Sequence, residues 1–504
     1  MKLYNTLLLT LYTLLSFSQF NIIVEDSTRN HLFTQVIQQN NNYRIISGTT
    51  DNYGNRGISI IKTDTTGTII EQKIISKNNE IWSEGLSQSY NEQSKFLAGS
   101  KVTDNTRGLI VLFDNNFDTI FTKIQYKDTF ASAYYGNVSV YNNKIICAGQ
   151  IETENEYANG FLVKYNINGD TIWTKSIGNS SDDLLGKKTI ETFDSSLISI
   201  GYTYIGSAIY KQDWYIVKTD SLGNLDWWLH PGNPNLNDGM AQDIIQTKDS
   251  CFVVVGGKAI YRNAGGTKFD GRIMKFDING NILWDKTYRN KLTQPGYDSL
   301  YCYFKSIIEL DDGGFAVATS IKNNVQYIPY ISSLYRFNSE GDTIWTRKYC
   351  SRCSYLGDNT ISAGIAFAST IQKTDNNNFL IGGWGNFEML FNHAYYQQMF
   401  LIKTDNLGCD GTEYSCPLVS VPRLITEKKE GILVYPNPAT NNLILDLQGL
   451  QNYRNVIIYD IYGRYVRKET IDKRNSKIEI NIVDLQSGIY FIKIGEYSTK
   501  FVKE

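Results

Sequence analysis

The sequence predicts an all-β protein, a seven-bladed β-propeller of four-stranded antiparallel blades followed by a small C-terminal β-sandwich. Three observations predict this fold. A unit of four short strand-like segments recurs seven times. An extra strand-like segment precedes the first unit, and the last unit lacks its final strand. A stretch with a different pattern follows the seventh unit. We expect a signal peptide at 1–18, the propeller at 19–417, a linker at 418–431 and a C-terminal domain at 432–504.

The composition of the chain excludes several classes of function. Its 504 residues include 49 Lys and Arg against 51 Asp and Glu, which leaves a formal net charge of −2. Proteins that bind nucleic acid or an anionic membrane surface need a basic footprint, so we expect neither partner. Three His are a poor inventory for multi-His metal chemistry, and we expect no metal and no cofactor. Aromatic residues make up 13% of the chain, enough to supply a large core.

The N-terminus has the features of a signal peptide. Met1 and Lys2 form a short positive region, and 3–17 is largely apolar. Ser16 and Ser18 put small residues where a signal peptidase reads, so we expect cleavage after Ser18. The apolar run is about 15 residues, short of the ~20 that span a bilayer, and no later stretch is long enough. The sequence thus predicts a secreted or outer-membrane surface protein that is not an integral membrane protein.

The repeated unit is recognised by a segment with a Lys, an Asp or Asn two residues later, a Gly, and then a Trp, as in IVKTDSLGNLDW at 216–227. The Lys or its equivalent lies 50 to 67 residues from the next one, at Lys62, Leu112, Lys164, Lys218, Lys275, Arg336 and Lys403. Two further strand-like segments precede each copy. Each unit therefore predicts an inner strand, an apolar strand, the Lys strand and an outer Trp strand.

The residues of this motif have mainly structural explanations. Asp or Asn followed by Gly suits a tight hairpin that needs a positive φ and a side-chain cap. Trp supplies a large apolar area between neighbouring sheets. Lys and Asp two apart share one face of a strand, where we expect them to pair. The functional alternative is calcium binding by the turns, although their spacing does not fit an EF-hand loop.

The two ends of the repeat array predict that the ring is closed. The strand-like segment at 20–25 precedes the first unit, and the seventh unit has no outer Trp strand. If 20–25 pairs beside 399–404, both open sheet edges disappear, which removes an aggregation liability. An open array of the units is the alternative. A miscounted weak unit would give six or eight blades.

Seven Cys have to be interpreted in an oxidising compartment. Cys147 and Cys251 lie in apolar runs and are predicted to be buried free thiols. Cys409 and Cys416 flank a short loop and form the best disulfide candidate. The Cys-x-x-Cys at 350 and 353 could be a redox motif, half a zinc site or a local disulfide, with Cys302 as a competing partner.

The C-terminal stretch carries four short motifs in order. They are a Tyr-Pro-Asn-Pro segment, an Asp-x-x-Gly turn, a Gly-Ile-Tyr segment and a terminal Lys-Phe-Val-Lys, and they include Tyr435, Pro436, Asn437, Pro438, Asp460, Gly463, Gly488 and Tyr490. These motifs resemble the type A C-terminal sorting domain of type IX secretion system cargo in the Bacteroidota. The repeats resemble, more loosely, those of secreted bacterial propellers. The resemblance implies export across the outer membrane, with the secretion machinery as partner. An ordinary carbohydrate-binding or immunoglobulin-like module is the alternative.

The long loops of the repeats collect aromatic residues that predict a ligand-binding rim for a glycan or a surface protein. The candidates are Trp214, Tyr261, Tyr301, Tyr330, Trp384 and Tyr395. The alternative is that they only pack loops together. With no recognisable nucleophile, acid–base or metal constellation, we predict a non-catalytic binding protein. A propeller lyase or hydrolase acting on extracellular polysaccharide is the alternative, with Asp183, Asp238, Asp298 and Asp358 as candidate acids. A third hypothesis is that the protein is a structural component of an adhesin.

Overall fold

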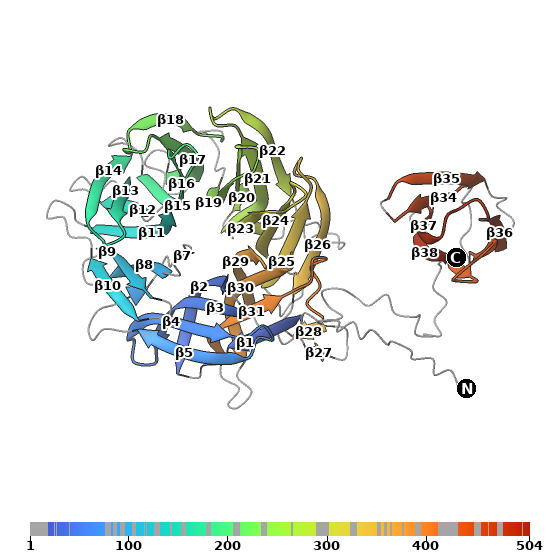
Figure 1. Cartoon of the computed structure of the whole chain (residues 1–504), viewed down its shortest axis with the longest axis horizontal. Coiled ribbons are helices and arrows are strands. Elements are labelled where there is room, and N and C mark those ends of the chain that lie inside the picture. Colours follow the sequence, from blue (N-terminus) through green and yellow to red (C-terminus); the bar gives the residue numbers. More distant parts are fainter. Residues whose placement is uncertain are drawn as a thin grey trace, which may run out of the picture. The chain divides into compact units, whose positions relative to one another are not determined.

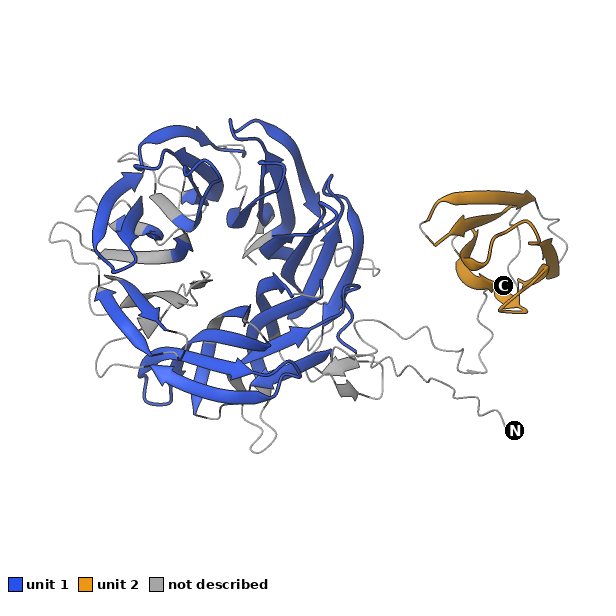
Figure 2. Cartoon of the chain, in the orientation of Figure 1, with its two compact units in different colours: residues 1–418 blue, residues 419–504 orange. Residues whose placement is uncertain are grey.

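The structure is a computed structural model that describes residues 19–411 and 432–504 apart from internal gaps. The longest gaps are 76–81, 125–131, 205–211, 233–238, 289–301, 323–329, 389–394, 448–454 and 471–476. The chain forms two compact units, unit 1 at 1–418 and unit 2 at 419–504, coloured blue and orange in Figure 2. The expected signal peptide and linker lie outside the described residues, so both stay predictions.

Unit 1 consists of antiparallel sheets whose strands pair mostly in chain order. Among the described residues it holds seven sheets of at least four strands, which Figure 1 shows around a ring. The strands of the first three are β2 (Arg29–Gln39), β3 (Asn42–Asp51), β4 (Arg56–Thr63) and β5 (Ile69–Ile75); β6 (Trp82–Ser83), β7 (Gln88–Tyr90), β8 (Phe96–Val102), β9 (Arg107–Phe113) and β10 (Thr119–Ile124); and β11 (Ser132–Tyr141), β12 (Lys144–Glu152), β13 (Ala158–Asn166) and β14 (Thr171–Ile177).

The remaining four sheets continue the same order. Their strands are β15 (Asp183–Glu191), β16 (Leu197–Tyr204), β17 (Gln212–Thr219) and β18 (Leu225–Leu229); β19 (Met240–Gln246), β20 (Phe252–Asn263), β21 (Gly266–Phe276) and β22 (Ile282–Tyr288); β23 (Cys302–Glu309), β24 (Phe315–Lys322), β25 (Tyr330–Phe337) and β26 (Thr343–Tyr349); and β29 (Ile365–Lys373), β30 (Phe379–Glu388) and β31 (Tyr395–Lys403) with β1 (Phe20–Val24). A small hairpin of β27 (Ser354–Leu356) and β28 (Thr360–Ser362) precedes β29. The described residues contain strands and no helix, which confirms the all-β fold class.

The ring of unit 1 is closed. Each sheet packs against the next, and β2 of the first sheet packs against β29, β30 and β31 of the last. These contacts contradict the open array that the sequence left as an alternative. In the sheets that begin with β2, β11, β15, β19 and β23, the first strand lies nearest the centre of the ring and the fourth strand lies at its outer edge (Figure 1). In the second and seventh sheets the outer strands are β10 and β1.

The Asp/Asn-x-x-Gly segments form tight turns between the third and fourth strands. Asp220 Oδ1 accepts the backbone N–H groups of Leu222 (2.9 Å) and Asn224 (2.8 Å), and Gly223 has a φ of 79°. Glycine adopts this conformation without a Cβ penalty. In the calcium alternative, this carboxylate oxygen would be a metal ligand. In the structure it instead accepts hydrogen bonds from the backbone of its own turn. The expected Lys–Asp pairing within the motif is wrong here, since Lys218 Nζ donates to Asp226 Oδ2 (2.8 Å) instead.

The motif Trp of one sheet packs on the turn glycine of the next. A Cβ built on Gly341 would lie only 3.0 Å from the nearest Trp284 ring atom, so the indole rests against the bare glycine backbone. The same contact joins Gly223 with Trp173, Gly280 with Trp227, and Gly408 with Trp345. Each contact removes a large aromatic surface from water, which stabilises the junction between two sheets.

Strand β1 supplies the outer strand that the seventh unit lacks. It pairs antiparallel with β31, placing Phe20 opposite Lys403, as Trp227 lies opposite Lys218 in an intact unit. The Phe20 ring lies 3.0 Å from a Cβ built on Gly67, the turn glycine of the first sheet. The predicted pairing of the N-terminal strand is confirmed, and Phe20 takes the place of the motif Trp.

Hydrogen bonds from the Gln398 side chain hold the segment between β1 and β2. Gln398 Oε1 accepts the Asp26 N–H (2.7 Å), and Gln398 Nε2 donates to the carbonyls of Asp26 (2.9 Å) and Arg29 (3.3 Å). His31 is fully buried, with Nε2 3.4 Å from Asp26 Oδ2. Burial acts to raise the pKa of Asp26, but hydrogen bonds with His31 and Thr28 outweigh it and lower the pKa to about 2.

The cysteines follow the predictions in part. Cys147 is a buried free thiol, as predicted, and Cys251 is free but only partly buried. Cys302 is also free and buried, so its role as a competing disulfide partner was wrong. Cys409 is disulfide-bonded. Its predicted partner Cys416, and the Cys-x-x-Cys at 350 and 353, lie outside the described residues.

Unit 2 contains two antiparallel sheets that enclose a common core. One holds β32 (Leu433–Tyr435), β33 (Asn442–Asp446) and β36 (Lys477–Asn481), and the other holds β34 (Asn455–Asp460), β35 (Tyr465–Thr470), β37 (Gly488–Ile494) and β38 (Tyr497–Lys503). Leu443 and Leu445 of the first sheet pack with Ile458, Ile492 and Phe501 of the second in one buried cluster.

Candidate functional site

The structure describes the side chains of three of the six aromatic residues predicted to form a rim, namely Trp214, Tyr330 and Trp384. Tyr261 lies on β20 and Tyr395 on β31, but their side chains lie outside the described part of the chain, as does Tyr301 altogether. For these three the prediction stays untested.

Trp214 belongs to the core and not to an exposed rim. Its side chain is fully buried, and its Nε1 donates to the carbonyl of Gly257 in the next sheet at 3.0 Å. The Arg272 guanidinium lies 4.6 Å from the centre of the indole ring. The prediction that Trp214 contacts a ligand was therefore wrong, because the residue joins two neighbouring sheets.

Tyr330 and Trp384 come together through a residue that the sequence did not single out. The ring centre of Phe367 lies 4.8 Å from that of Tyr330 and 4.7 Å from that of Trp384. All three side chains are half-buried, and burial raises the pKa of Tyr330. We call these three residues the aromatic row. It joins the start of β25 in the sixth sheet to β29 and β30 in the seventh. Flat rings with partial exposure can stack on a sugar ring or on an apolar side chain.

A second group of side chains lies on the strands nearest the centre of the ring. In five of these inner strands the register shifts by one residue, so that a single residue is left without a partner in the next strand. These bulge residues are Gly136, Lys187, Gln242, Lys305 and Ser369. A β-bulge re-aims its side chain, and bulges are common beside functional sites.

Three consecutive sheets place Lys187, Gln242 and Lys305 at this bulge, and we call them the axial cluster. Lys305 Nζ donates to Gln242 Oε1 at 3.3 Å. Gln242 Nε2 in turn donates to the Tyr303 hydroxyl (2.9 Å), which fixes the orientation of the amide. All three members keep partial exposure, whereas Ala241 and Asp243 beside Gln242 are buried. The cluster thus presents two ammonium groups and an amide on the inner strands.

The electrostatics of the axial cluster are unusual for lysines. Burial, and then the positive charge of Lys187, lower the pKa of Lys305 to about 7. Burial also lowers the pKa of Lys187. Tyrosine rings give partial compensation, since Lys187 Nζ lies 5.4 Å from the Tyr202 ring centre and Lys305 Nζ lies 4.4 Å from that of Tyr303.

The carboxylate next in sequence to Gln242 is engaged elsewhere. Asp243 pairs with Lys188, and its side-chain oxygens also accept the backbone N–H groups of Ile244 (2.9 Å) and Ile307 (2.9 Å). Asn137 makes a similar bridge between the third and fourth sheets, where its Oδ1 accepts the Thr189 N–H at 3.2 Å. In these two places the residue after the bulge therefore joins neighbouring inner strands.

The four carboxylates proposed for the enzyme alternative have side chains outside the described part of the chain. Asp183 begins β15, and its side chain lies outside the description. Asp238, Asp298 and Asp358 lie outside it entirely, so the alternative is untested. Within the described parts of the chain there is no group of three His, Cys, Asp or Glu placed to hold a metal ion, and no helix long and apolar enough to cross a membrane.

The C-terminal motif residues hold the strands of unit 2 together. Asn437 Oδ1 accepts the Val502 N–H at 2.8 Å, which ties the Tyr-Pro-Asn-Pro segment to β38. Asp460 bonds the backbone N–H of Arg464 (3.0 Å) across the turn that contains Gly463, whose φ is 75°. Tyr490 stacks on Phe501, with ring centres 5.5 Å apart. Tyr435, Pro436, Pro438 and Gly488 lie on or beside the strands β32 and β37.

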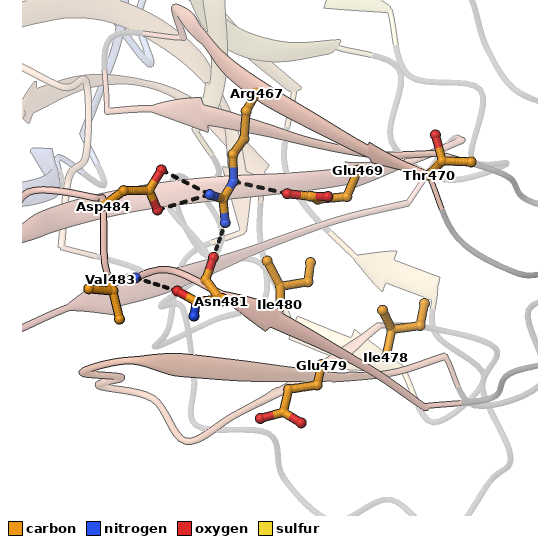
Figure 3. Close-up of a pocket in the computed structure, with 9 residues that line it drawn as sticks. All are labelled: Arg467, Glu469, Thr470, Ile478, Glu479, Ile480, Asn481, Val483 and Asp484. Carbon is orange, nitrogen blue, oxygen red and sulfur yellow. Dashed lines mark hydrogen bonds and ion pairs between the residues drawn. The ribbon is translucent and has the colours of Figure 1, made fainter.

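A shallow groove of about 460 Å³ in unit 2 is lined by β35, β36 and the turn after β36. Figure 3 shows Arg467 at its centre. The guanidinium makes two bonds to Asp484 (2.9 and 3.0 Å) and lies 3.3 Å from Glu469. It also donates to the carbonyl of Asn481. Because these groups satisfy Arg467 within the fold, the groove is a structural joint between the two sheets.

The comparisons with known proteins identify unit 2. Residues 433–504 match the family model of the secretion system C-terminal sorting domain. This match confirms the resemblance inferred from the four motifs and shows that the tail is an export signal of the type IX secretion system. It places the destination at the cell surface or in the extracellular space. No curated protein sequence matches this chain.

Solved structures similar to the chain include several large proteins at low identity. The β-propeller domain of the Trilobed protease from Pyrococcus furiosus is 8% identical, with a TM-score of 0.39, over 76% of this chain and 99% of that one. A subtype N10 neuraminidase-like protein of A/little yellow-shouldered bat/Guatemala/060/2010 is 9% identical, with a TM-score of 0.37, over 65% of this chain and 96% of that one. A Lactobacillus plantarum protein is 12% identical, with a TM-score of 0.39, over 73% and 94%. At these scores the likeness supports no argument about function.

Proposed function

We propose that unit 1 is a non-catalytic binding module for an extracellular glycan or surface protein, and that unit 2 directs its export. The aromatic row is the observation on which this proposal rests. Tyr330, Phe367 and Trp384 form a continuous ring surface from two sheets, and each keeps partial exposure. Aromatic side chains on a rigid sheet scaffold bind with little entropic cost and often dominate interface energetics. Residues 1–18 would direct the chain to the periplasm before this export.

The test uses the chain as it is secreted, screened on a glycan array and against purified surface proteins. For the best ligand, we expect Trp384→Ala to weaken binding at least tenfold, because it removes the end of the row. Phe193→Ala is the matched control. Phe193 is 64% exposed on the β15–β16 turn, and only its backbone N–H makes a bond there, to Gln246. We expect the control to bind as the unchanged chain does.

Two outcomes would contradict the proposal. One is a failure of the binding test: either no ligand binds the chain, or Trp384→Ala binds the ligand as tightly as the Phe193→Ala control does. The other is turnover of a polysaccharide, lost on Asp183→Asn, which would support the lyase or hydrolase alternative. Circular dichroism of each variant shows whether the sheets are retained, so that lost binding can be told from lost folding.

A further inference from the structure

The axial cluster carries positive charge that no carboxylate of the described residues neutralises. Within the described residues, neither Lys187 nor Lys305 forms a salt bridge with a carboxylate. Lys188, next in sequence to Lys187, has its partner in Asp243. Partly desolvated charges without counter-charges are unfavourable, and the two lysines also repel each other. A bound anion would relieve both costs.

The cluster is built from equivalent positions and not from a chance surface grouping. Lys187, Gln242 and Lys305 are the bulge residues of β15, β19 and β23, three inner strands in succession. Asp243, the residue after the bulge in β19, accepts the backbone N–H of Ile307 in β23 and so joins the two inner strands. Because this frame holds the three residues in one layer, their charged and amide groups converge from three sheets.

The chemistry of the cluster suits one oxyanion. Two ammonium groups supply charge-assisted hydrogen bonds, while the Gln242 amide N–H groups donate within the protein, to the Tyr303 hydroxyl (2.9 Å) and the Ala241 carbonyl (3.2 Å). Gln242 already accepts a bond from Lys305 through Oε1, so the side chains are within reach of a shared ligand. The bulge residue of the next inner strand is Ser369, two residues after Phe367 of the aromatic row. Lys305 of the axial cluster and Phe367 of the aromatic row thus lie on neighbouring inner strands, β23 and β29, while Tyr330 and Trp384 lie on β25 and β30.

We propose that the axial cluster binds the anionic group, a carboxylate or a sulfate ester, of an acidic glycan. The proposal rests on the glycan-binding function inferred for unit 1 and adds the charge class of the ligand. The aromatic row stacks on the sugar ring, and Lys187 and Lys305 hold the anion. Gln242 orients the Lys305 ammonium group, which donates to its Oε1 at 3.3 Å.

The experiment measures the affinity of the full secreted chain for three oligosaccharides by calorimetry. Tetragalacturonate carries carboxylates, a sulfated maltotetraose carries sulfate esters, and plain maltotetraose carries no charge. We expect one charged probe to bind at least tenfold more tightly than the neutral one. Lys187→Met and Lys305→Met, which keep the length of the side chain, should each reduce that affinity about tenfold. The control is Lys248→Met, because Lys248 is a 65% exposed lysine on the β19–β20 turn.

A stability measurement keeps the proposal testable if a variant folds poorly. A ligand that binds only the folded state raises the melting temperature. We expect the preferred charged probe to raise the melting temperature of the unchanged chain and of Lys248→Met, but not that of the Lys187→Met, Lys305→Met double variant. Equal increases in all three would overturn the proposal.

The outcomes separate the two proposals. If maltotetraose and the charged probes bind equally, and only Trp384→Ala weakens binding, the anion site is wrong and the binding function stands. If no probe binds, the anion site is contradicted, whereas the binding function is decided by the glycan array and the surface-protein screen. If the lysine variants bind the charged probes as tightly as the unchanged chain, the axial cluster is not the site.

Discussion

Equivalent positions of the repeated sheets make the same contact at the outer edge of the ring but hold different residues at its centre. At the outer edge, the same contact recurs between neighbouring sheets, an aromatic side chain on a turn glycine, and even β1 supplies Phe20 to complete it. At the centre, equivalent bulge positions hold Gly, Lys, Gln, Lys and Ser. The shared contact is what a closed ring needs from every sheet. The residues that differ at equivalent positions are those the ring does not need, and they are where a specific function can reside.

The largest effect should come from breaking the outer contact at the closure. We expect Phe20→Ala to destabilise unit 1 by about 3 kcal/mol, because Phe20 is 8% exposed and its loss leaves a cavity at the only junction made by the two ends of the array. Phe193→Ala should change stability by less than about 0.5 kcal/mol, since Phe193 is 64% exposed.

Urea unfolding followed by Trp fluorescence measures this difference. All 8 Trp of the chain lie in 1–418, so the signal reports unit 1 alone. If Phe20→Ala unfolds at the same urea concentration as Phe193→Ala, β1 does not complete the last sheet energetically.

A turn glycine meets two requirements, a positive φ and the absence of a Cβ against the Trp ring. A smaller loss of stability should separate them. Gly54 and Gly341 both have a positive φ, 86° and 81°, but a Cβ on Gly54 would have no atom within 4 Å, whereas one on Gly341 would lie 3.0 Å from Trp284. We expect Gly54→Ala to cost about 1 kcal/mol for the backbone conformation alone. Gly341→Ala should cost about 2 kcal/mol, because the indole must also move.

The same urea series measures both variants. Equal losses would mean that the Trp–Gly contact adds nothing beyond the backbone requirement of the turn. The comparison of the outer edge with the centre would then lose its energetic basis.

The outer edge could be predicted from the sequence because its signal repeats. Seven copies of one motif gave the strand order, the turns and the closure by 20–25, and the missing Trp strand showed where the ring ends meet. Trp214 was misassigned because it has no such repeated signal. It falls outside the motif, so it was interpreted as a loop residue, whereas it lies in strand β17 and its indole packs in the junction with the next sheet.

The axial cluster could not be predicted because a bulge has no fixed sequence pattern. Neighbouring residues in a strand normally face opposite ways, and a one-residue register shift alters that alternation without a marker residue. The adjacent Lys187 and Lys188 were the available signal, since two consecutive lysines on an inner strand break the expected apolar alternation. Phe367 was missed because the sequence does not show that β25 and β29 bring it against Tyr330.

The smallest expected effect tests the centre of the ring through pH. The pKa of Lys305 is about 7 in the folded protein, against roughly 10.4 in an unfolded chain. Above pH 7 the folded protein holds Lys305 neutral, so affinity for tetragalacturonate should fall up to tenfold between pH 6 and pH 8, while the ligand stays ionised. Without ligand, the sign for stability is opposite: the unfolded chain binds the proton more readily, so stability decreases as pH falls from about 10 to about 7.

The groups around Lys305 decide whether this titration can be assigned to it. Charged and titratable groups on its own strand and on those around it include Cys302, Tyr303 and Glu309 on β23, Lys187 and Lys188 on β15, Asp243 on β19, Lys258 on β20, Asp270, Arg272 and Lys275 on β21, Lys322 on β24 and Lys373 on β29. Lys187 also has a lowered pKa, so it shares the titration. Lys305→Met should therefore flatten most of the pH dependence, and Lys248→Met should leave it intact. A pH profile that is the same in both variants would show that the axial lysines do not hold the anion, because removing one of two coupled charges must shift the titration of the other.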